Sequence, residues 1–384
     1  MVTNNNTSRL SPPPSRGVAG WLFAIAYLIC SVLAFFEIRY AAVKTGLADD
    51  IATIVETRRL IDRDVPLRSS WTGIASLDEG ISTLVAAFIA GPTGWDKGFQ
   101  LHMFYFLVSF FPVIAIWTVE SVRKGNKGAL ISFTSLFAIF YQTVGGAIII
   151  PLYYLAYLFN TRKSEYWSSF QRQVPISYSK ALLPSLMLGY FIPTLLLFAW
   201  PLLDSDPEYK VTQLLIVLWQ PTPLLANLLL FLLYKFNSAT ASPAFSNPKS
   251  KTADVPSLAT LYKLLYIVAL IAHIFTISVV FLSTDPLHSF SHVFVRPQEW
   301  GQSGMIKGLH IIFQADYNLI FLSSTIWAFQ AVWDLKRTGL ARVSLLKAAV
   351  LIIVHSLICG PAASLAAVWY WREHKFAEID DKTA

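Results

Sequence analysis

Apolar residues along this chain gather into long blocks, which short polar or basic segments separate. A helix rises about 1.5 Å per residue, so roughly 20 apolar residues are needed to cross a hydrocarbon layer about 30 Å thick. Eight blocks are long enough, namely Val18–Ile38, Phe99–Val119, Ala129–Leu158, Ala181–Leu203, Val211–Lys235, Leu258–Leu282, Gly308–Trp333 and Val343–Trp371. A shorter block, Ile81–Ala90, is compatible with a re-entrant, an interfacial or a ninth spanning helix. The pattern predicts an all-α fold, a polytopic transmembrane bundle of eight or nine helices.

Composition indicates that the bilayer is the main solvent. Of the 384 residues, 55% are hydrophobic and only 14% are charged, against the quarter or so that is usual in soluble domains. A water-soluble fold would have to expose much of this apolar surface. We therefore expect a single transmembrane domain at 18–371, with a disordered polar tail at 1–17 and a charged tail at 372–384.

Charge is distributed as membrane topology requires. The net charge is +7, but the 30 Lys and Arg residues lie mostly between apolar blocks, so nucleic-acid binding is not needed to explain them. The connections 159–180, 236–257 and 334–342 are rich in basic residues and are predicted to face the cytosol. Cys30 and Cys359 both lie inside apolar blocks, so we expect neither a disulfide framework nor a cysteine metal site.

Asp316 is the clearest candidate for chemistry, because it lies inside an apolar block. A charged group at the centre of a span costs about 2.5–3.5 kcal/mol on insertion scales, so it generally faces a partner, a cavity or water. Its neighbours His310, Gln314, Tyr317 and Asn318 form a polar string along the same predicted helix. The alternative for this string is an interhelical hydrogen-bond network that only specifies packing.

Glu120 is the second candidate, at the end of the block Phe99–Val119. Taken alone, it could be an interfacial residue paired with Arg123, a contact worth a few tenths of a kcal/mol if exposed. The predicted topology, however, ends this block on the membrane face from which the block of Asp316 begins. We therefore expect Glu120 and Asp316 to line one cavity mouth.

Several kinds of chemistry lack their usual motifs. The seven histidines are scattered without ligand spacing, and no Asp-rich cluster for magnesium diphosphate is present, so no metal is expected. His288 and His292 are four residues apart, but the loop composition around them predicts surface positions. Nucleotide-binding and serine-hydrolase motifs are absent as well, so no cofactor is expected.

The strings around Trp117–Arg123, Thr143–Tyr154, Trp219–Pro223 and Leu309–Asn318 resemble those of fungal membrane-bound terpene cyclases of meroterpenoid biosynthesis, the macrophorin, ascochlorin and ascofuranone type. The resemblance covers most of the chain from Val18 to Trp371 in length and helix number. It implies an enzyme of secondary metabolism, a class II-like cyclase of isomerase or lyase type. In such enzymes an acid protonates an alkene or epoxide of a prenyl chain, usually farnesyl, without metal. Glu120 and Asp316 are the positions that match the family's essential acids.

Other residues are assigned supporting roles in this hypothesis. Arg123, Gln314, Tyr317, Asn318 and His310 are candidate orienting or substrate-binding groups, and Gln142, Trp219 and Gln220 are candidates for the cavity lining. The expected partners are a hydrophobic prenylated substrate and the lipid bilayer, in the endoplasmic reticulum. A secondary transporter or channel with buried acids is the alternative, although the chain shows no paired inverted hydropathy pattern. A non-catalytic assembly factor would leave both acids replaceable.

Overall fold

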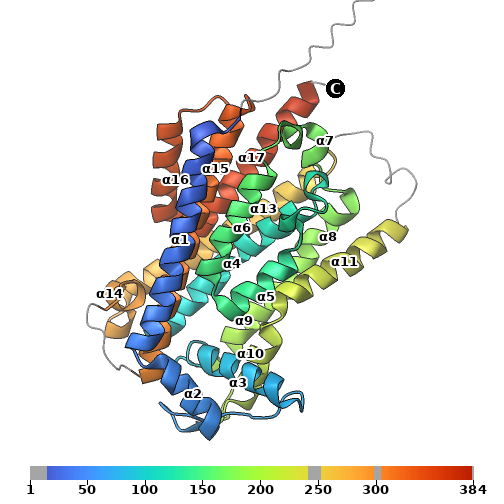
Figure 1. Cartoon of the computed structure of the whole chain (residues 1–384). Helices are drawn as coiled ribbons and strands as arrows, with labels where there is room; N and C mark the ends of the chain where they lie inside the picture. The colour runs from blue at the N-terminus through green and yellow to red at the C-terminus, as the bar shows by residue number, and fades with distance from the viewer. Residues whose placement is uncertain (1–14, 241–251, 298–303, 383–384) are drawn as a thin grey trace, which may run out of the picture.

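The computed structural model describes residues 15–240, 252–297 and 304–382, which fold almost entirely as helices (Figure 1). The helices are α1 (Gly17–Lys44), α2 (Leu47–Thr57), α3 (Ala75–Ile89), α4 (Lys97–Ser121), α5 (Thr134–Val144), α6 (Gly146–Asn160), α7 (Ser169–Arg172), α8 (Ile176–Leu186), α9 (Ile192–Ala199), α10 (Lys210–Trp219), α11 (Thr222–Thr240), α13 (Val255–Leu282), α14 (Phe290–Phe294), α15 (Gly304–Arg337), α16 (Leu345–Cys359) and α17 (Pro361–Lys382). Strands β1 (Arg59–Leu60) and β2 (Val65–Pro66) pair antiparallel. The prediction of an all-α fold is confirmed.

Short helical segments of other types complete the chain. Segments of 3-10 type lie at Lys124–Asn126, Leu130–Ser132, Ser164–Trp167, Trp200–Leu202 and Pro286–His288, and a π-helical turn at Met187–Phe191 joins α8 to α9. The π-turn keeps α8 and α9 continuous, as the predicted span Ala181–Leu203 requires.

Helix α4 is the central helix of the bundle. Every residue from Leu101 to Glu120 is buried except Phe104, and α13, α14, α15 and α17 pack around the helix. The ring of Phe99 stacks on His310 with centroids 5.2 Å apart, and Phe106 meets Tyr317 at 5.8 Å. The residue numbers of the two contacts rise together along both helices. Helices α4 and α15 therefore run in the same direction.

The predicted span Ala129–Leu158 is a hairpin of two short helices, α5 and α6. Gly145 separates them at φ 127°, a backbone conformation that glycine adopts far more readily than other residues. The hairpin begins and ends at the same place, because the Asn160 amide donates to the Asn126 side chain at 2.7 Å. It therefore enters the bundle and returns to the same end, whereas the apolar block predicted a single crossing.

Two further predicted spans are interrupted. The block Val211–Lys235 forms α10 and α11, which are bent by 57° at a short break. The block Val343–Trp371 forms α16 and α17, and Gly360 (φ 92°) with Pro361 separates them. A Gly-Pro pair ends a helix because glycine favours the left-handed region and proline cannot donate a backbone hydrogen bond.

The predicted number of eight or nine spanning helices is wrong. Among the described residues, four helices are long and apolar enough to cross a membrane, at Gly17–Lys44, Lys97–Ser121, Phe170–Leu202 and Val255–Leu282, and the bent pair α10–α11 would add a fifth. The block Ile81–Ala90 contributes to α3, which packs against α2 and α10 at one end of the bundle. The apolar blocks correctly predicted helical segments, but the pattern of apolar residues does not indicate whether one continuous helix runs through a block.

Parts of both predicted tails are built into the bundle. Arg16 is buried, and its guanidinium donates to Asp334 at 2.7 and 2.9 Å, whereas residues 1–14 of the predicted N-terminal tail lie outside the described residues. Helix α17 continues to Lys382, and Arg372 and Glu373 are buried within it. The prediction of a charged tail starting at 372 is therefore wrong for this stretch.

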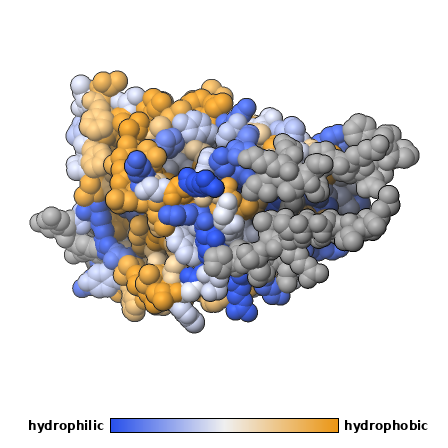
Figure 2. Space-filling view, turned by 90° about the horizontal axis from the view of Figure 1, so that it is seen from above, coloured by the Kyte–Doolittle hydropathy of each residue, from blue (hydrophilic) through white to orange (hydrophobic). Residues whose placement is uncertain are grey.

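Large apolar side chains are exposed along several outer helices. Examples are Trp21 and Phe36 on α1, Ile271 on α13, and Leu357 on α16, which are 69%, 62%, 62% and 75% exposed. Figure 2 looks onto the end of the molecule and shows apolar residues gathered along its left and upper rim. Exposed apolar area on this scale is rare on soluble monomers. Together with the four long apolar helices, it is compatible with a membrane protein.

Candidate active site

Asp316 lines a cavity inside the bundle. The cavity has a volume of about 260 Å³, and Asp316 is the one charged side chain among its described lining residues. Helices α1, α2, α3, α4, α5 and α15 contribute to the wall, together with Trp219 at the end of α10. The described lining is otherwise mainly aliphatic and aromatic. A carboxyl group in such surroundings is favoured in its neutral form, because apolar walls penalise charge.

The tip of the α5–α6 hairpin fixes the position of Asp316. The backbone N–H of Ala147, in the first turn of α6, donates to Asp316 Oδ1 at 2.6 Å. Gly146 permits this approach, since a β-carbon there would lie 2.8 Å from Ile320 Cδ1 and 3.1 Å from Asp316 Oδ2. With Oδ1 occupied as an acceptor, Oδ2 is the oxygen that can carry and deliver a proton.

Aromatic rings surround the acid. Phe88, Phe106, Phe110, Tyr141, Tyr190, Trp219 and Phe313 line the cavity. Their rings meet edge to face or tilted, with centroids 5.4 Å apart for Phe88 and Trp219, 5.3 Å for Phe88 and Phe313, and 5.4 Å for Phe110 and Tyr141. Ring faces attract a cation, by about 2 kcal/mol or more when desolvated, so this wall suits a positively charged intermediate.

Polar side chains of α5 and α10 complete the lining. Gln142 lines the cavity and donates to the Gln220 carbonyl at 2.9 Å, and Trp219 donates its indole N–H to Thr194 at 2.9 Å. The structure thus places Gln142 and Trp219 in the lining, whereas Gln220 is not part of it. The Tyr141 hydroxyl is buried and has no hydrogen-bond partner among the described residues.

Glu120 does not share this cavity, which corrects the prediction that both acids line one mouth. Glu120 lies four turns beyond Phe106 on α4, about 20 Å along the helix axis from the level of Asp316 and Tyr317. The prediction counted Ala129–Leu158 as one crossing. Because that block is a hairpin, α15 begins at the end of the bundle where α4 begins, and the two acids lie at different depths.

A buried ion network surrounds Glu120. Its Oε1 accepts from Arg123 at 2.9 Å, Arg372 at 3.0 Å and the Trp369 indole at 3.2 Å. Arg123 also pairs with Glu373 at 2.6 Å. The network continues through Arg172, which pairs with Glu373 at 2.9 Å and with Asp254 at 3.5 Å. The sequence did not indicate the members on α17, because a charged stretch near the C-terminus was expected to be a solvated tail.

The remaining predicted residues have other surroundings. Arg123 belongs to the ion network, and Tyr317 is buried against Tyr105 and Phe106 without lining the cavity. Asn318 is exposed, so an orienting role beside Asp316 is contradicted. Gln314 donates to the carbonyls of His292 and Val293 at 3.1 and 3.0 Å. It therefore holds α14 against α15, away from the acid.

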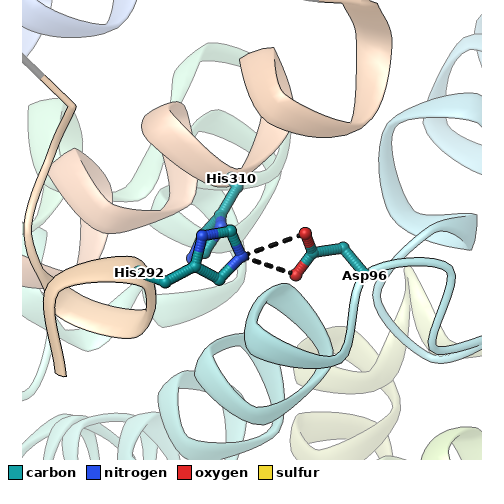
Figure 3. Close-up of side chains that lie close together, drawn as sticks. All are labelled: Asp96, His292 and His310. Carbon is teal, nitrogen blue, oxygen red and sulfur yellow. Dashed lines mark hydrogen bonds and ion pairs between the residues drawn. The ribbon is translucent and has the colours of Figure 1, made fainter. Parts of the chain in front are cut away.

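A second polar cluster lies where α4 begins, and it contains His310 (Figure 3). His292 Nε2 lies 3.0 Å from both carboxylate oxygens of Asp96, and one ligand-type atom from each of Asp96, His292 and His310 lies within 4.8 Å of the others. Burial opposes ionisation of Asp96, but hydrogen bonds from His292 and the Phe99 N–H hold its pKa below the usual range. The expectation that the histidines are scattered is wrong here, since two of them converge although 18 positions separate them.

Comparisons with known proteins agree with the resemblance seen in the sequence. A model of the CtvD domain matches residues 24–376. Terpene cyclase ascI of Acremonium egyptiacum is 26% identical over 323 residues, 82% of each chain, and terpene cyclase ctvD of Aspergillus terreus is 25% identical over 375 residues, 91% of this chain and 98% of that one. FAD-dependent monooxygenase verC1 of Penicillium polonicum is 24% identical over 272 residues, 71% of this chain but 32% of that protein. No solved structure matches.

The matched region extends from α1 to the buried part of α17. It includes the hairpin tip, Asp316 and the ion network around Glu120. The resemblance to fungal terpene cyclases is confirmed by relatives of that name, and this chain matches each of them over most of the relative's length. Since the family model covers far more than half of its residues, this chain belongs to the CtvD domain family.

Proposed function

We propose that this chain is a membrane-bound terpene cyclase of meroterpenoid biosynthesis that works by acid-initiated, metal-independent cyclisation. Relatives named terpene cyclase support the reaction type. One observation carries the mechanism: Asp316 is the one carboxyl group among the described residues that line a mainly apolar, aromatic cavity. The substrate class is a prenyl chain, farnesyl in the first instance, attached to an aromatic or quinone-like head.

Asp316 is the proton donor in this proposal. Oδ2 delivers a proton to the terminal alkene, or to the oxygen of a terminal epoxide, and a tertiary carbocation forms. The Ala147 N–H at Oδ1 then stabilises the carboxylate that remains, because the positive end of the α6 dipole faces it. The apolar walls keep the proton on Asp316 before the transfer. The Ala147 N–H stabilises the carboxylate once the proton has left, which favours the transfer as the cation forms.

The cavity wall guides the ring closures. Neighbouring double bonds of the folded chain attack the cation in turn, and each ring closure moves the positive charge along the chain. The rings of Phe106, Phe110 and Phe313 belong to this wall; a ring face turned to the cation stabilises it, and the apolar wall keeps water out. Loss of a proton from carbon to a base or water ends the cascade, so the product is an isomer of the substrate.

Glu120 is proposed to act as a structural residue, which differs from the role that the resemblance implies. It is fully buried, and its carboxylate is held by two guanidinium groups and an indole N–H. A carboxylate in such charge-assisted hydrogen bonds is a poor proton donor. The ion network around it joins α4, α17 and the segments before α8 and α13, and thereby closes the end of the bundle opposite the hairpin tip.

The bilayer is the proposed surrounding of the bundle, in the endoplasmic reticulum. The exposed apolar faces of α1, α13 and α16 would contact lipid, and a prenylated substrate would partition into the same phase. Of these helices α1 also contributes Ile38 to the cavity wall, so the proposed route of the substrate to Asp316 leads from the lipid along α1 without crossing water.

Product analysis in a host that lacks related enzymes tests this function. Membranes containing the protein are supplied with a farnesylated phenol and, separately, with its terminal epoxide, and products are analysed by mass spectrometry and NMR. We expect a product of unchanged mass with fewer double bonds from at least one substrate. Absence of any cyclic product, together with substrate-dependent flux through reconstituted vesicles, would favour the transporter alternative.

A further inference from the structure

We propose that Asp96, His292 and His310 bind one first-row divalent transition-metal ion, best represented by Zn²⁺, which fastens α14 to α4 and α15 (Figure 3). The three residues come from the N-cap of α4, from α14 and from the second turn of α15. None of them lines the cavity around Asp316. The proposed site is thus separate from the proposed cyclisation and does not supply its proton.

The spacing of the three side chains suits such an ion. His292 Nε2 lies 3.0 Å from both Asp96 oxygens, and one atom from each residue lies within 4.8 Å of the other two. Ligands of a tetrahedral ion with bonds of about 2.1 Å lie roughly 3.4 Å apart. Since the observed spacing brackets that value, small side-chain rotations are enough to complete the site.

Contacts behind His310 hold its ring in place. The ring stacks on Phe99 with centroids 5.2 Å apart, and Nε2 lies 3.3 Å from both the Val293 carbonyl oxygen and Gln314 Nε2. When Nε2–H donates to that carbonyl, Nδ1 carries the lone pair that a metal needs. A ligating histidine almost always donates its other N–H to a carbonyl or carboxylate in this way, which fixes the tautomer and the ring orientation.

The backbone brings α14 close independently of any ion. A β-carbon at position 98 would overlap the His292 ring and the Leu287 carbonyl, so Gly98 is needed for this approach. Lys97 pairs with Asp285 at 2.8 Å across the same junction, and Arg296 pairs with Glu37 of α1. These contacts hold α14 against the start of α4 and thereby place His292 beside Asp96 without an ion.

The donor set selects the class of ion. Two imidazoles and one carboxylate suit Zn²⁺ and its first-row neighbours, whereas Mg²⁺ and Ca²⁺ prefer sites built from oxygen alone. Three protein ligands leave a fourth position for water. The side chains of His292 and Asp96 are 34% and 20% exposed, so an ion can reach the site from outside the bundle.

Metal binding to purified full-length protein in detergent tests the proposal. The protein is stripped of metal and titrated with Zn²⁺ against a chromophoric chelator, and with Co²⁺ while its visible absorption is recorded. We expect one equivalent bound, ligand-field bands from Co²⁺, and a higher unfolding temperature with Zn²⁺. His292→Ala should weaken binding by more than the roughly 10–100-fold that loss of an outer-shell partner costs.

Two further variants make the result decisive. Asp96→Asn keeps an N-cap oxygen for the Phe99 N–H but removes the ligand charge, so it should weaken binding while α4 stays folded. His288→Ala is the matched control, because His288 precedes α14 and bonds to Ser283 outside the cluster. No stoichiometric binding by the wild-type protein, or equal binding by His292→Ala, would overturn the site. Neither result bears on cyclisation, which product analysis measures separately.

Discussion

At the scale of single residues, two carboxyl groups inside the bundle have opposite surroundings. Asp316 faces apolar and aromatic walls and accepts one backbone N–H, whereas Glu120 accepts from two arginines and an indole. The first environment favours a neutral acid that can give up a proton. The second holds a charge in a fixed position. Substitutions that remove the charge but keep the shape separate these two roles.

Asp316→Asn should abolish most of the cyclisation. The amide oxygen can still accept the Ala147 N–H, so the hairpin tip stays in place, but the side chain has no acidic proton to deliver. Loss of general acid catalysis costs roughly 10²–10⁴-fold, and an alkene, as a poor base, should suffer more than an epoxide. Product formed per molecule of folded protein measures the effect. Asn318→Ala, on the exposed side of the same helix, serves as the control, and wild-type turnover by Asp316→Asn would rule out the mechanism.

Glu120→Gln should mainly lower stability. Removing one partner of a buried ion pair is destabilising, by up to about 3–5 kcal/mol, because Arg123 and Arg372 lose a compensating charge. The unfolding temperature in detergent is the measurement. Glu378→Gln on α17 is the matched control, since its pair with Lys375 is exposed and worth about 0–1 kcal/mol. A variant that melts like the wild type yet forms no product would instead give Glu120 a part in the chemistry.

At the scale of elements, the α5–α6 hairpin builds the site. It carries Tyr141 and Gln142 on one arm and presents the Ala147 N–H of α6 to Asp316 at its tip. Irregular backbone at this depth is tolerated in a membrane protein where protein groups satisfy it and it lines a cavity. The tip is therefore both the structural break and the support of the proposed acid.

Gly146→Ala should disturb the acid without unfolding the bundle. The new β-carbon would lie 2.8 Å from Ile320 Cδ1 and 3.1 Å from Asp316 Oδ2, so the hairpin tip or the carboxyl group has to move. We expect a cyclisation rate at least several-fold lower with a small change in unfolding temperature. Gly80→Ala on α3 is the control, because nothing lies within 4 Å of its added β-carbon. Alanine is favoured there by about 0.5–1 kcal/mol. Equal turnover in both variants would contradict the tight fit at Gly146.

At the scale of the whole molecule, charge differs between the two ends of the bundle. The connections 159–180 and 334–342 lie together, because Arg16 donates to both Thr161 and Asp334 at 2.7 Å. The acidic turn 204–208 lies near the start of α4, since Tyr209 packs on Trp95 with centroids 5.9 Å apart. Residues 241–251 of the third basic connection lie outside the described residues. The basic end is predicted to face the cytosol.

Cysteine labelling in sealed membranes tests that orientation. In a background with Cys30 and Cys359 replaced by alanine, Lys163→Cys at the basic end should react with an impermeant maleimide from the cytosolic side. Ser205→Cys at the acidic end should react only after the membranes are opened. Both positions are exposed, so failure to react reports sidedness and not burial. The opposite labelling pattern would invert the topology.

The sequence alone was sufficient for the helical class, for the centres of α1, α4, α13 and α15, and for Asp316 as a costly acid within an apolar block. These features depend on local apolar content and on the free-energy cost of one charge, which are properties of short stretches. Only the tertiary structure decided that Ala129–Leu158 doubles back, that Glu120 lies far from Asp316, and that Asp96 meets two histidines. A glycine break looks the same in sequence whether the chain continues or reverses. Which outcome occurs depends on the contacts made after the break, here Asn160 with Asn126 and Ala147 with Asp316, between residues up to 169 positions apart.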